Sequence, residues 1–169
     1  MYRKHFLITI LICLVACSNS YSQEQVLYKQ VDSTKLFMDI YYPELINTEK
    51  TYPAIVFYFG GGWNGGSIKQ FEPHARYFSR RGMVTFLVDY RVRSRHQTTP
   101  FESLKDAKSA IRFIREHADK FHVDTSKIVA SGGSAGGHLA AATALIDDYN
   151  ENTDNISISS IPNALILFN

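Results

Sequence analysis

Cysteine is scarce in this 169-residue chain, and its placement excludes several kinds of site. The two cysteines, Cys13 and Cys17, both lie near the N-terminus, so the domain that follows has no internal disulfide and no thiolate metal site. Neither sign of charge predominates, because the formal net charge is only +2. The sequence also has no cluster of basic residues interleaved with aromatics. The composition therefore does not support nucleic-acid binding, and we expect neither a metal nor a cofactor.

A long hydrophobic run is missing as well. Residues 6–16 are apolar and follow Arg3 and Lys4, which is typical of a signal peptide and too short to span a bilayer. Leu-Val-Ala-Cys at 14–17 resembles the bacterial lipobox, whose cysteine is lipidated and becomes the first mature residue. We therefore predict export to the periplasm or outer surface, with a lipoprotein-type signal peptide at 1–17 and a lipid anchor at Cys17. The alternative is ordinary cleavage between 18 and 23, which would release a soluble protein.

After a linker at 18–24, residues 25–169 predict one domain in which strands alternate with helices. Two β-rich runs separated by a turn-like cluster predict an antiparallel hairpin at the edge of a sheet. Apolar runs then predict buried strands, and amphipathic spacing predicts the helices that cover them. The hairpin is expected at 25–31 and 35–42, the strands at 53–59, 83–88, 127–131 and 164–168, and the helices at 70–81, 101–121 and 135–146. This order predicts an α/β fold with a doubly wound, mostly parallel sheet, whose ligands bind beyond the carboxyl ends of the strands.

A glycine-flanked serine follows one of the predicted strands. Gly132-x-Ser134-x-Gly136 lies between a β-type run and a small-residue helix pattern, as in a nucleophile elbow. Glycines suit the positions two residues either side of the serine, because so sharp a turn leaves no room for a Cβ. Ser134 is therefore the candidate nucleophile.

A second glycine turn, at 60–62, follows another buried strand. Acyl transfer needs hydrogen-bond donors for the developing oxyanion, and one such donor contributes about 3 kcal/mol of transition-state stabilisation. The N–H groups of Gly61, Gly62 and Ala135 are the candidates. Glycine suits the first two positions because a side chain there would block the substrate carbonyl.

These motifs together resemble those of α/β-hydrolases of the hormone-sensitive-lipase-like esterase group. Phe-Gly-Gly-Gly-Trp at 59–63 resembles the group's His-Gly-Gly-Gly-Trp/Phe segment, and Asp-Tyr-Arg at 89–91 resembles its Asp-Tyr-Arg after the next strand. The resemblance implies an α/β-hydrolase fold, an acyl-enzyme at Ser134 and a carboxylic ester substrate. Related bacterial enzymes remove acyl groups from carbohydrates, so the expected partner is a small-molecule or carbohydrate ester.

Two aromatic residues are candidates for contact with that substrate. Trp63 is expected either to stack on a sugar or to anchor the glycine loop in the core. Tyr90 is expected either to line the acyl pocket or to pack inside the domain.

The sequence departs from the group's pattern in two ways. Phe59 replaces a histidine that orients the glycine loop without reacting. In addition, the acid and histidine of the triad should follow the serine on later loops, yet His138 is the only histidine after Ser134. His138 is expected to pack at the start of its helix, since the base should approach from a separate loop. We therefore expect residues 25–169 to be the N-terminal two-thirds of a hydrolase domain, lacking the last strands, with a non-catalytic remnant as the alternative.

A different class of protein also fits part of the pattern. The segment from Gly60 to Gly65 has the pattern Gly-x-Gly-x-x-Gly and follows a predicted strand. Asp89 is at the end of the next strand, and both features are typical of a dinucleotide-binding oxidoreductase. The elbow, the N-terminal hairpin and the export signal argue against this alternative.

The remaining charged residues have simpler interpretations. The basic segment 92–100 and the polar segment 147–160 are expected to be surface loops. Asp89 and Asp106 are expected to hold loops through hydrogen bonds. Several basic residues are expected to be solvated, with an anionic-substrate pocket as the alternative: Arg91, Arg93, Arg95 and His96. Four acidic residues are also expected to be solvated: Asp147, Asp148, Glu151 and Asp154.

Overall fold

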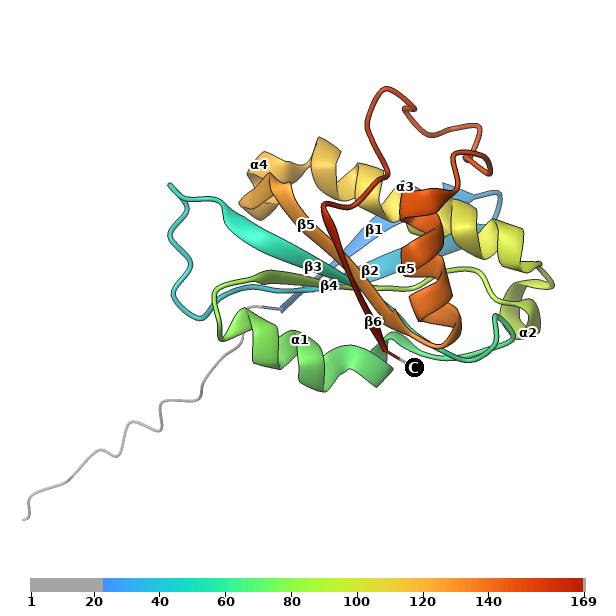
Figure 1. Ribbon diagram of the computed structural model, residues 1–169, viewed down its shortest axis with the longest axis horizontal. Helices are drawn as coiled ribbons and strands as arrows, with labels where there is room; N and C mark the ends of the chain where they lie inside the picture. The colour runs from blue at the N-terminus through green and yellow to red at the C-terminus, as the bar shows by residue number, and fades with distance from the viewer. Residues whose placement is uncertain (1–22, 169) are drawn as a thin grey trace, which may run out of the picture.

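The computed structural model describes residues 23–168, so the predicted signal peptide and Cys17 lie outside the described range. Within it, a six-stranded sheet carries helices on both faces (Figure 1). The strands are β1 (Gln23–Val31), β2 (Thr34–Tyr41), β3 (Tyr52–Tyr58), β4 (Val84–Val88), β5 (Val123–Gly133) and β6 (Ala164–Phe168). Their order across the sheet is β1-β2-β4-β3-β5-β6.

The predicted fold class is confirmed. β1 and β2 form the expected antiparallel hairpin, and β2 pairs antiparallel with β4. β4, β3, β5 and β6 are mutually parallel, so their carboxyl ends share one edge of the sheet. β1 begins at Gln23, inside the range predicted as linker.

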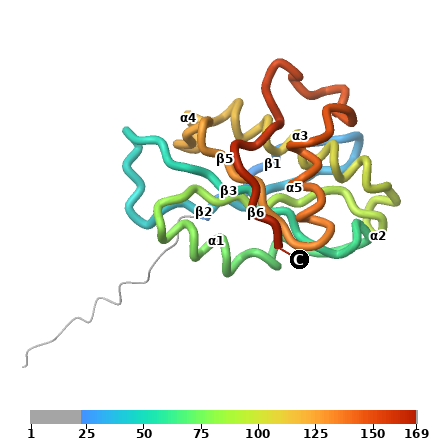
Figure 2. Tube along the Cα trace, in the orientation of Figure 1, coloured from blue at the N-terminus to red at the C-terminus, as the bar shows by residue number. Residues whose placement is uncertain are grey.

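The helices divide between the two faces of the sheet, as Figures 1 and 2 show. They are η1 (Ile68–Phe71, a 3-10 turn), α1 (Glu72–Ser79), α2 (Arg93–His96), α3 (Pro100–Glu116), α4 (Ala118–Phe121) and α5 (Ala135–Leu145). Side chains alternate along β3, so Ile55 and Phe57 pack with residues of η1 and α1. Val56 and Tyr58 face the larger core under α3 and α5. β3 is thus buried on both faces, as its unbroken apolar run predicted.

Two boundaries differ from expectation. The helix predicted over 101–121 is interrupted at His117, where φ is −109° and ψ 24°, and α4 follows as a separate turn. The segment 92–100 is not wholly irregular, because α2 forms within it and Thr99 begins α3 with a reciprocal capping box to Glu102.

β6 was predicted to be buried, and this is wrong for the described chain. Its side chains are exposed, with Leu167 at 53% and Phe168 at 37%. β6 pairs with β5 along one edge, and no strand of residues 23–168 pairs with its other edge. No helix in the described residues has the length and apolar character needed to cross a membrane.

Candidate active site

Ser134 lies at the junction of β5 and α5 in a strained backbone conformation. Its φ is 51° and its ψ −118°, which L-residues rarely adopt and which costs on the order of 1–3 kcal/mol. Two backbone hydrogen bonds hold the turn: Ser134 N donates to Phe168 O at 3.0 Å, and His138 N donates to Ser134 O at 2.9 Å. The residue is exposed. The predicted sharp strand-to-helix turn is therefore present, and it presents the hydroxyl-bearing residue to solvent.

The glycines on either side of Ser134 are required by the packing of this turn. A Cβ on Gly132 would lie 2.6 Å from the carbonyl oxygen of Tyr58, and one on Gly136 would collide with the same oxygen. The turn therefore sits directly on the end of β3, and only glycine allows so close an approach.

The glycine loop after β3 lies against the elbow. A Cβ on Gly60 would be 2.8 Å from Gly133 O, while Gly61 and Gly62 adopt φ values of 134° and 62°. Gly60 N already donates to Gln70 Oε1 at 2.5 Å. Gly61 and Gly62 are exposed, and within residues 23–168 their N–H groups have no acceptor. These two N–H groups are therefore free to bind an oxyanion.

Ala135 is the first residue of α5, so its N–H is among the donors that a helix leaves unsatisfied at its start. The same helix end carries a partial positive charge. The three predicted oxyanion donors thus come from two loops at the same edge of the sheet.

The glycine loop is fastened to the segment after β4. Arg93 N donates to Trp63 O, and Ser94 N donates to Asn64 O, both at 2.9 Å. Trp63 itself has a φ of 56° and is partly buried against the larger core. The structure thus supports the predicted anchoring role of Trp63.

Tyr90 does not reach the surface, which corrects its candidacy as a substrate contact. The residue is fully buried, and its hydroxyl donates to the carbonyl oxygen of Phe59 at 2.5 Å. The two rings stack with centroids 4.0 Å apart. Tyr90 therefore supports the base of the glycine loop, and Phe59 packs where the related group has histidine.

Arg91, predicted to be solvated, is buried in an ion-pair network that sequence reasoning missed. Its guanidinium forms two 2.8 Å hydrogen bonds to the carboxylate of Asp106, which is fully buried. Lys29 Nζ lies 2.7 Å from the same carboxylate, and Glu151 contacts both cations. Burial acts to lower the pKa of Arg91, but hydrogen bonding to Asp106 and the nearby negative charges outweigh it and raise the pKa. The expectation that Asp106 holds a loop is confirmed.

The segment 147–160 is the expected surface loop, and Asp147 and Asp148 are exposed, but Glu151 and Asp154 are paired rather than solvated, which corrects the expectation for these two. Lys108 Nζ donates to the carbonyl oxygens of Ile146, Asp147 and Asp148 at 2.7–2.9 Å. Asp154 pairs with Arg112 at 2.9 Å. α3 thus holds this segment across the end of α5.

No described side chain hydrogen-bonds to the Ser134 hydroxyl, so the structure brings no base to it. The ring of His138 packs edge to face on Trp63, with centroids 5.2 Å apart, as the packing role predicted. The ring of His74 lies among Phe57, Phe71 and Phe168. Within residues 23–168, no group of His, Cys, Asp and Glu could hold a metal ion.

This elbow, on a mixed sheet with an oxyanion loop beside it, defines an α/β-hydrolase. The chain belongs to the BD-FAE family, whose model matches residues 38–164. This membership excludes the dinucleotide-binding alternative, and the Asp89 carboxylate is already bound by Arg95.

Several of the similar proteins are esterases. Carboxylesterase NlhH of Mycobacterium tuberculosis is 31% identical over 113 residues, which are 66% of this chain and 34% of that protein. Esterase 2 of Thermogutta terrifontis, phosphorylated by paraoxon, superposes with a TM-score of 0.85 at 50% identity, covering 87% of this chain and 56% of that one. The propionate-bound structure of the same esterase superposes with a TM-score of 0.84 at 51% identity, covering 86% of this chain and 54% of that one. The chain therefore spans about a third of the curated relative and little more than half of the solved enzyme.

Proposed function

We propose that this protein is a serine esterase that cleaves carboxylic esters through an acyl-enzyme at Ser134. The Oγ atom attacks the ester carbonyl carbon, the bond from that carbon to the alcohol oxygen breaks, and the alcohol leaves with the proton that the serine hydroxyl has lost. Water then cleaves the acyl-enzyme, releasing the acid and restoring the hydroxyl. The N–H groups of Gly61, Gly62 and Ala135 stabilise the oxyanion in both steps.

The observation that carries this proposal is the backbone of Ser134, which has a φ of 51° and lies against the glycine loop. A strained non-glycine residue persists only where its surroundings hold it, and such residues cluster at functional sites. Propionate- and butyrate-bound structures of the similar Thermogutta esterase support short acyl groups as substrates. Acyl groups on carbohydrates remain the further proposed substrate class.

Hydrolysis of p-nitrophenyl propionate by the purified protein tests the proposal. We expect turnover that Ser134→Ala abolishes, with an unchanged thermal midpoint showing that the variant is folded. Turnover that survives Ser134→Ala would contradict the proposal, and folded protein without turnover would favour the non-catalytic alternative.

We further propose that residues 1–17 direct export and that a lipid on Cys17 anchors the protein to a membrane. The sequence pattern at 14–17 supports this proposal. Intact mass measured from membrane fractions should show a lipidated Cys17 as the first residue, and Cys17→Ala should remove the lipid. Cleavage between 18 and 23 would contradict the anchor while keeping export.

A further inference from the structure

A cavity of about 770 Å³ opens beside the oxyanion loop. Gly62, one of the proposed oxyanion donors, forms part of its wall, and the opposite wall comes from α2 and the residues that lead into α3. The cavity therefore adjoins the oxyanion loop through Gly62, and it is large enough for a sugar-sized group.

The residues that line the cavity are mostly polar, and the charge among them is positive. Asn64, Ser94, Gln97 and Thr98 supply amide and hydroxyl groups, and Trp63 supplies an aromatic wall. Among residues 23–168, no carboxylate lines the cavity, and Arg93 is the single charged residue of the lining. Such a lining matches a ligand that carries several hydroxyls and a negative charge.

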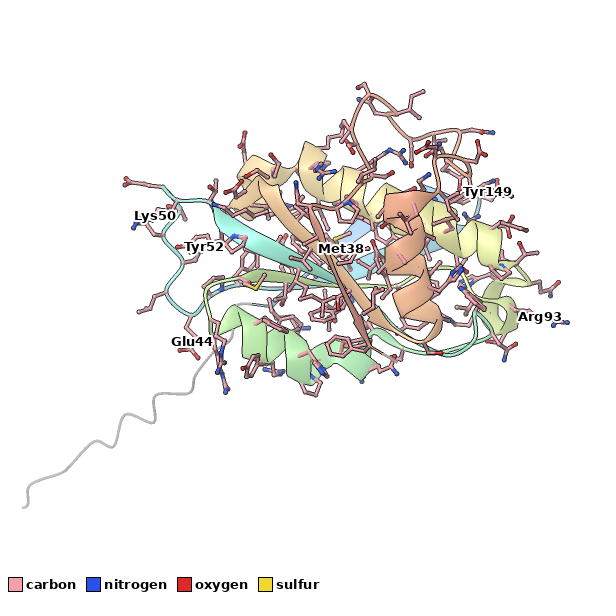
Figure 3. All side chains as sticks on the ribbon, viewed as in Figure 1. Met38, Glu44, Lys50, Tyr52, Arg93 and Tyr149 are labelled. Carbon is pink, nitrogen blue, oxygen red and sulfur yellow. The ribbon has the colours of Figure 1, made fainter. Side chains whose placement is uncertain are left out.

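Arg93 differs from the two arginines next to it along the chain. Arg91 is paired with Asp106, and Arg95 is paired with Asp89 at 2.6 Å. Arg93, which lines the cavity, forms no ion pair with any residue in the range 23–168, and it is exposed at the edge of the molecule (Figure 3). Its guanidinium is therefore free to bind a carboxylate, for which its planar donors are well suited.

Two lining residues also carry unpartnered polar atoms. Trp63 Nε1 and Thr98 Oγ1 are both shielded from solvent, and neither has a hydrogen-bond partner within the described chain. A buried polar atom without a partner costs about 1–3 kcal/mol. A ligand oxygen could bond to either atom only after the side chain turned toward the cavity.

We propose that this cavity binds the non-reacting part of the ester, and that this part is an acidic sugar whose carboxylate pairs with Arg93. The inference rests on the proposed function for its link to catalysis, because the cavity adjoins the oxyanion loop. The binding itself depends only on the lining.

Intrinsic fluorescence provides a direct test, because Trp63 is the single tryptophan of the chain. Ser134→Ala protein is titrated with glucuronate and, in parallel, with glucose, which has the same ring hydroxyls without the carboxylate. We expect a saturable change in Trp63 emission with glucuronate and several-fold weaker binding of glucose, up to about fivefold, since an exposed ion pair contributes little more than that. Acetate, which has the charge without the ring, should also bind more weakly than glucuronate.

Arg93→Gln should reduce the affinity for glucuronate to that for glucose and leave the affinity for glucose unchanged. The matched control is Arg81→Gln, because Arg81 is an exposed arginine that stacks on Tyr77 beyond the end of α1. Equal binding of the two sugars, an unchanged affinity in Arg93→Gln, or no saturable change in emission would overturn the proposal. Because no turnover is needed, failure of this experiment is distinct from failure of the esterase assay.

Discussion

Gly60 and Ser134 lie against each other at the carboxyl ends of neighbouring parallel strands. A Cβ on Gly60 would lie 3.5 Å from the Cβ of Ser134 and 2.8 Å from the carbonyl oxygen of Gly133. Tyr58, at the end of β3, pairs with Gly132, at the end of β5, so both loops leave the sheet at the same level. This contact places the glycine N–H groups beside the serine.

Gly60→Ala should therefore impair hydrolysis. The added methyl group would push the oxyanion loop away from the elbow, and a displacement near 1 Å costs on the order of 100-fold in rate. Steady-state kinetics should show the loss mainly in kcat. Gly65→Ala is the matched control in the same loop, because its Cβ would meet only Ser94 Oγ at 3.6 Å. Equal losses in the two variants would contradict the close contact.

Ser134→Gly should stabilise the protein while abolishing hydrolysis. Glycine adopts a φ near 51° without the backbone strain that a Cβ causes there. The free energy of unfolding should therefore rise by about 1 kcal/mol or more. Ser134→Ala should be equally inactive without this gain, because alanine has the same Cβ. Urea unfolding of both variants checks the difference, and equal stabilities would show that the turn is not strained.

Asp106→Asn should destabilise the protein strongly. The substitution leaves Lys29 and Arg91 buried with one fewer counter-charge, and breaking such a buried network costs about 3–5 kcal/mol. Asp124→Asn serves as the control, because Asp124 pairs with Lys127 at the surface and should change stability little. Similar urea midpoints for the two variants would mean that the network does not hold the fold.

Glu151 should make stability depend on pH in the acid range. Partial burial acts to raise its pKa, but the hydrogen bond and charge of Lys29, together with Arg91, outweigh it and lower the pKa below its ordinary value. The resulting stabilisation is fully present above the ordinary carboxyl pKa of about 4.3 and is lost as pH falls through the lowered value. Glu151→Gln should flatten this part of the curve of urea midpoint against pH.

The exposed Glu49→Gln should keep the acid dependence of the unmodified protein. If Glu151→Gln also kept this dependence of the urea midpoint on pH, another group would be responsible for the loss of stability at acid pH.

The elbow and the glycine loop were predictable because their requirements are local. Gly132 and Gly136 leave room for the backbone of β3, and an apolar run before each glycine turn indicates a strand that ends there. The same reasoning predicted the hairpin, the mostly parallel sheet and the structural role of Asp106.

Long-range contacts were not predictable. Glu151 lies 60 residues after Arg91, and no spacing in the sequence indicates that they meet. Gln70, whose side chain holds Gly60, is an unremarkable polar residue at the start of a helix pattern. The apolar run of β6 predicted burial, but burial also needs covering elements, which an apolar run alone does not supply.

Covalent labelling of Ser134 tests the central claim most directly. The similar Thermogutta esterase is phosphorylated by paraoxon, so the purified protein is treated with paraoxon beside that enzyme and its peptides are mapped by mass spectrometry. We predict one diethyl phosphate on the peptide that contains Ser134, and none in Ser134→Ala. An adduct on another residue, or an unlabelled Ser134 under conditions that label the Thermogutta enzyme, would contradict the assignment of Ser134 as the nucleophile.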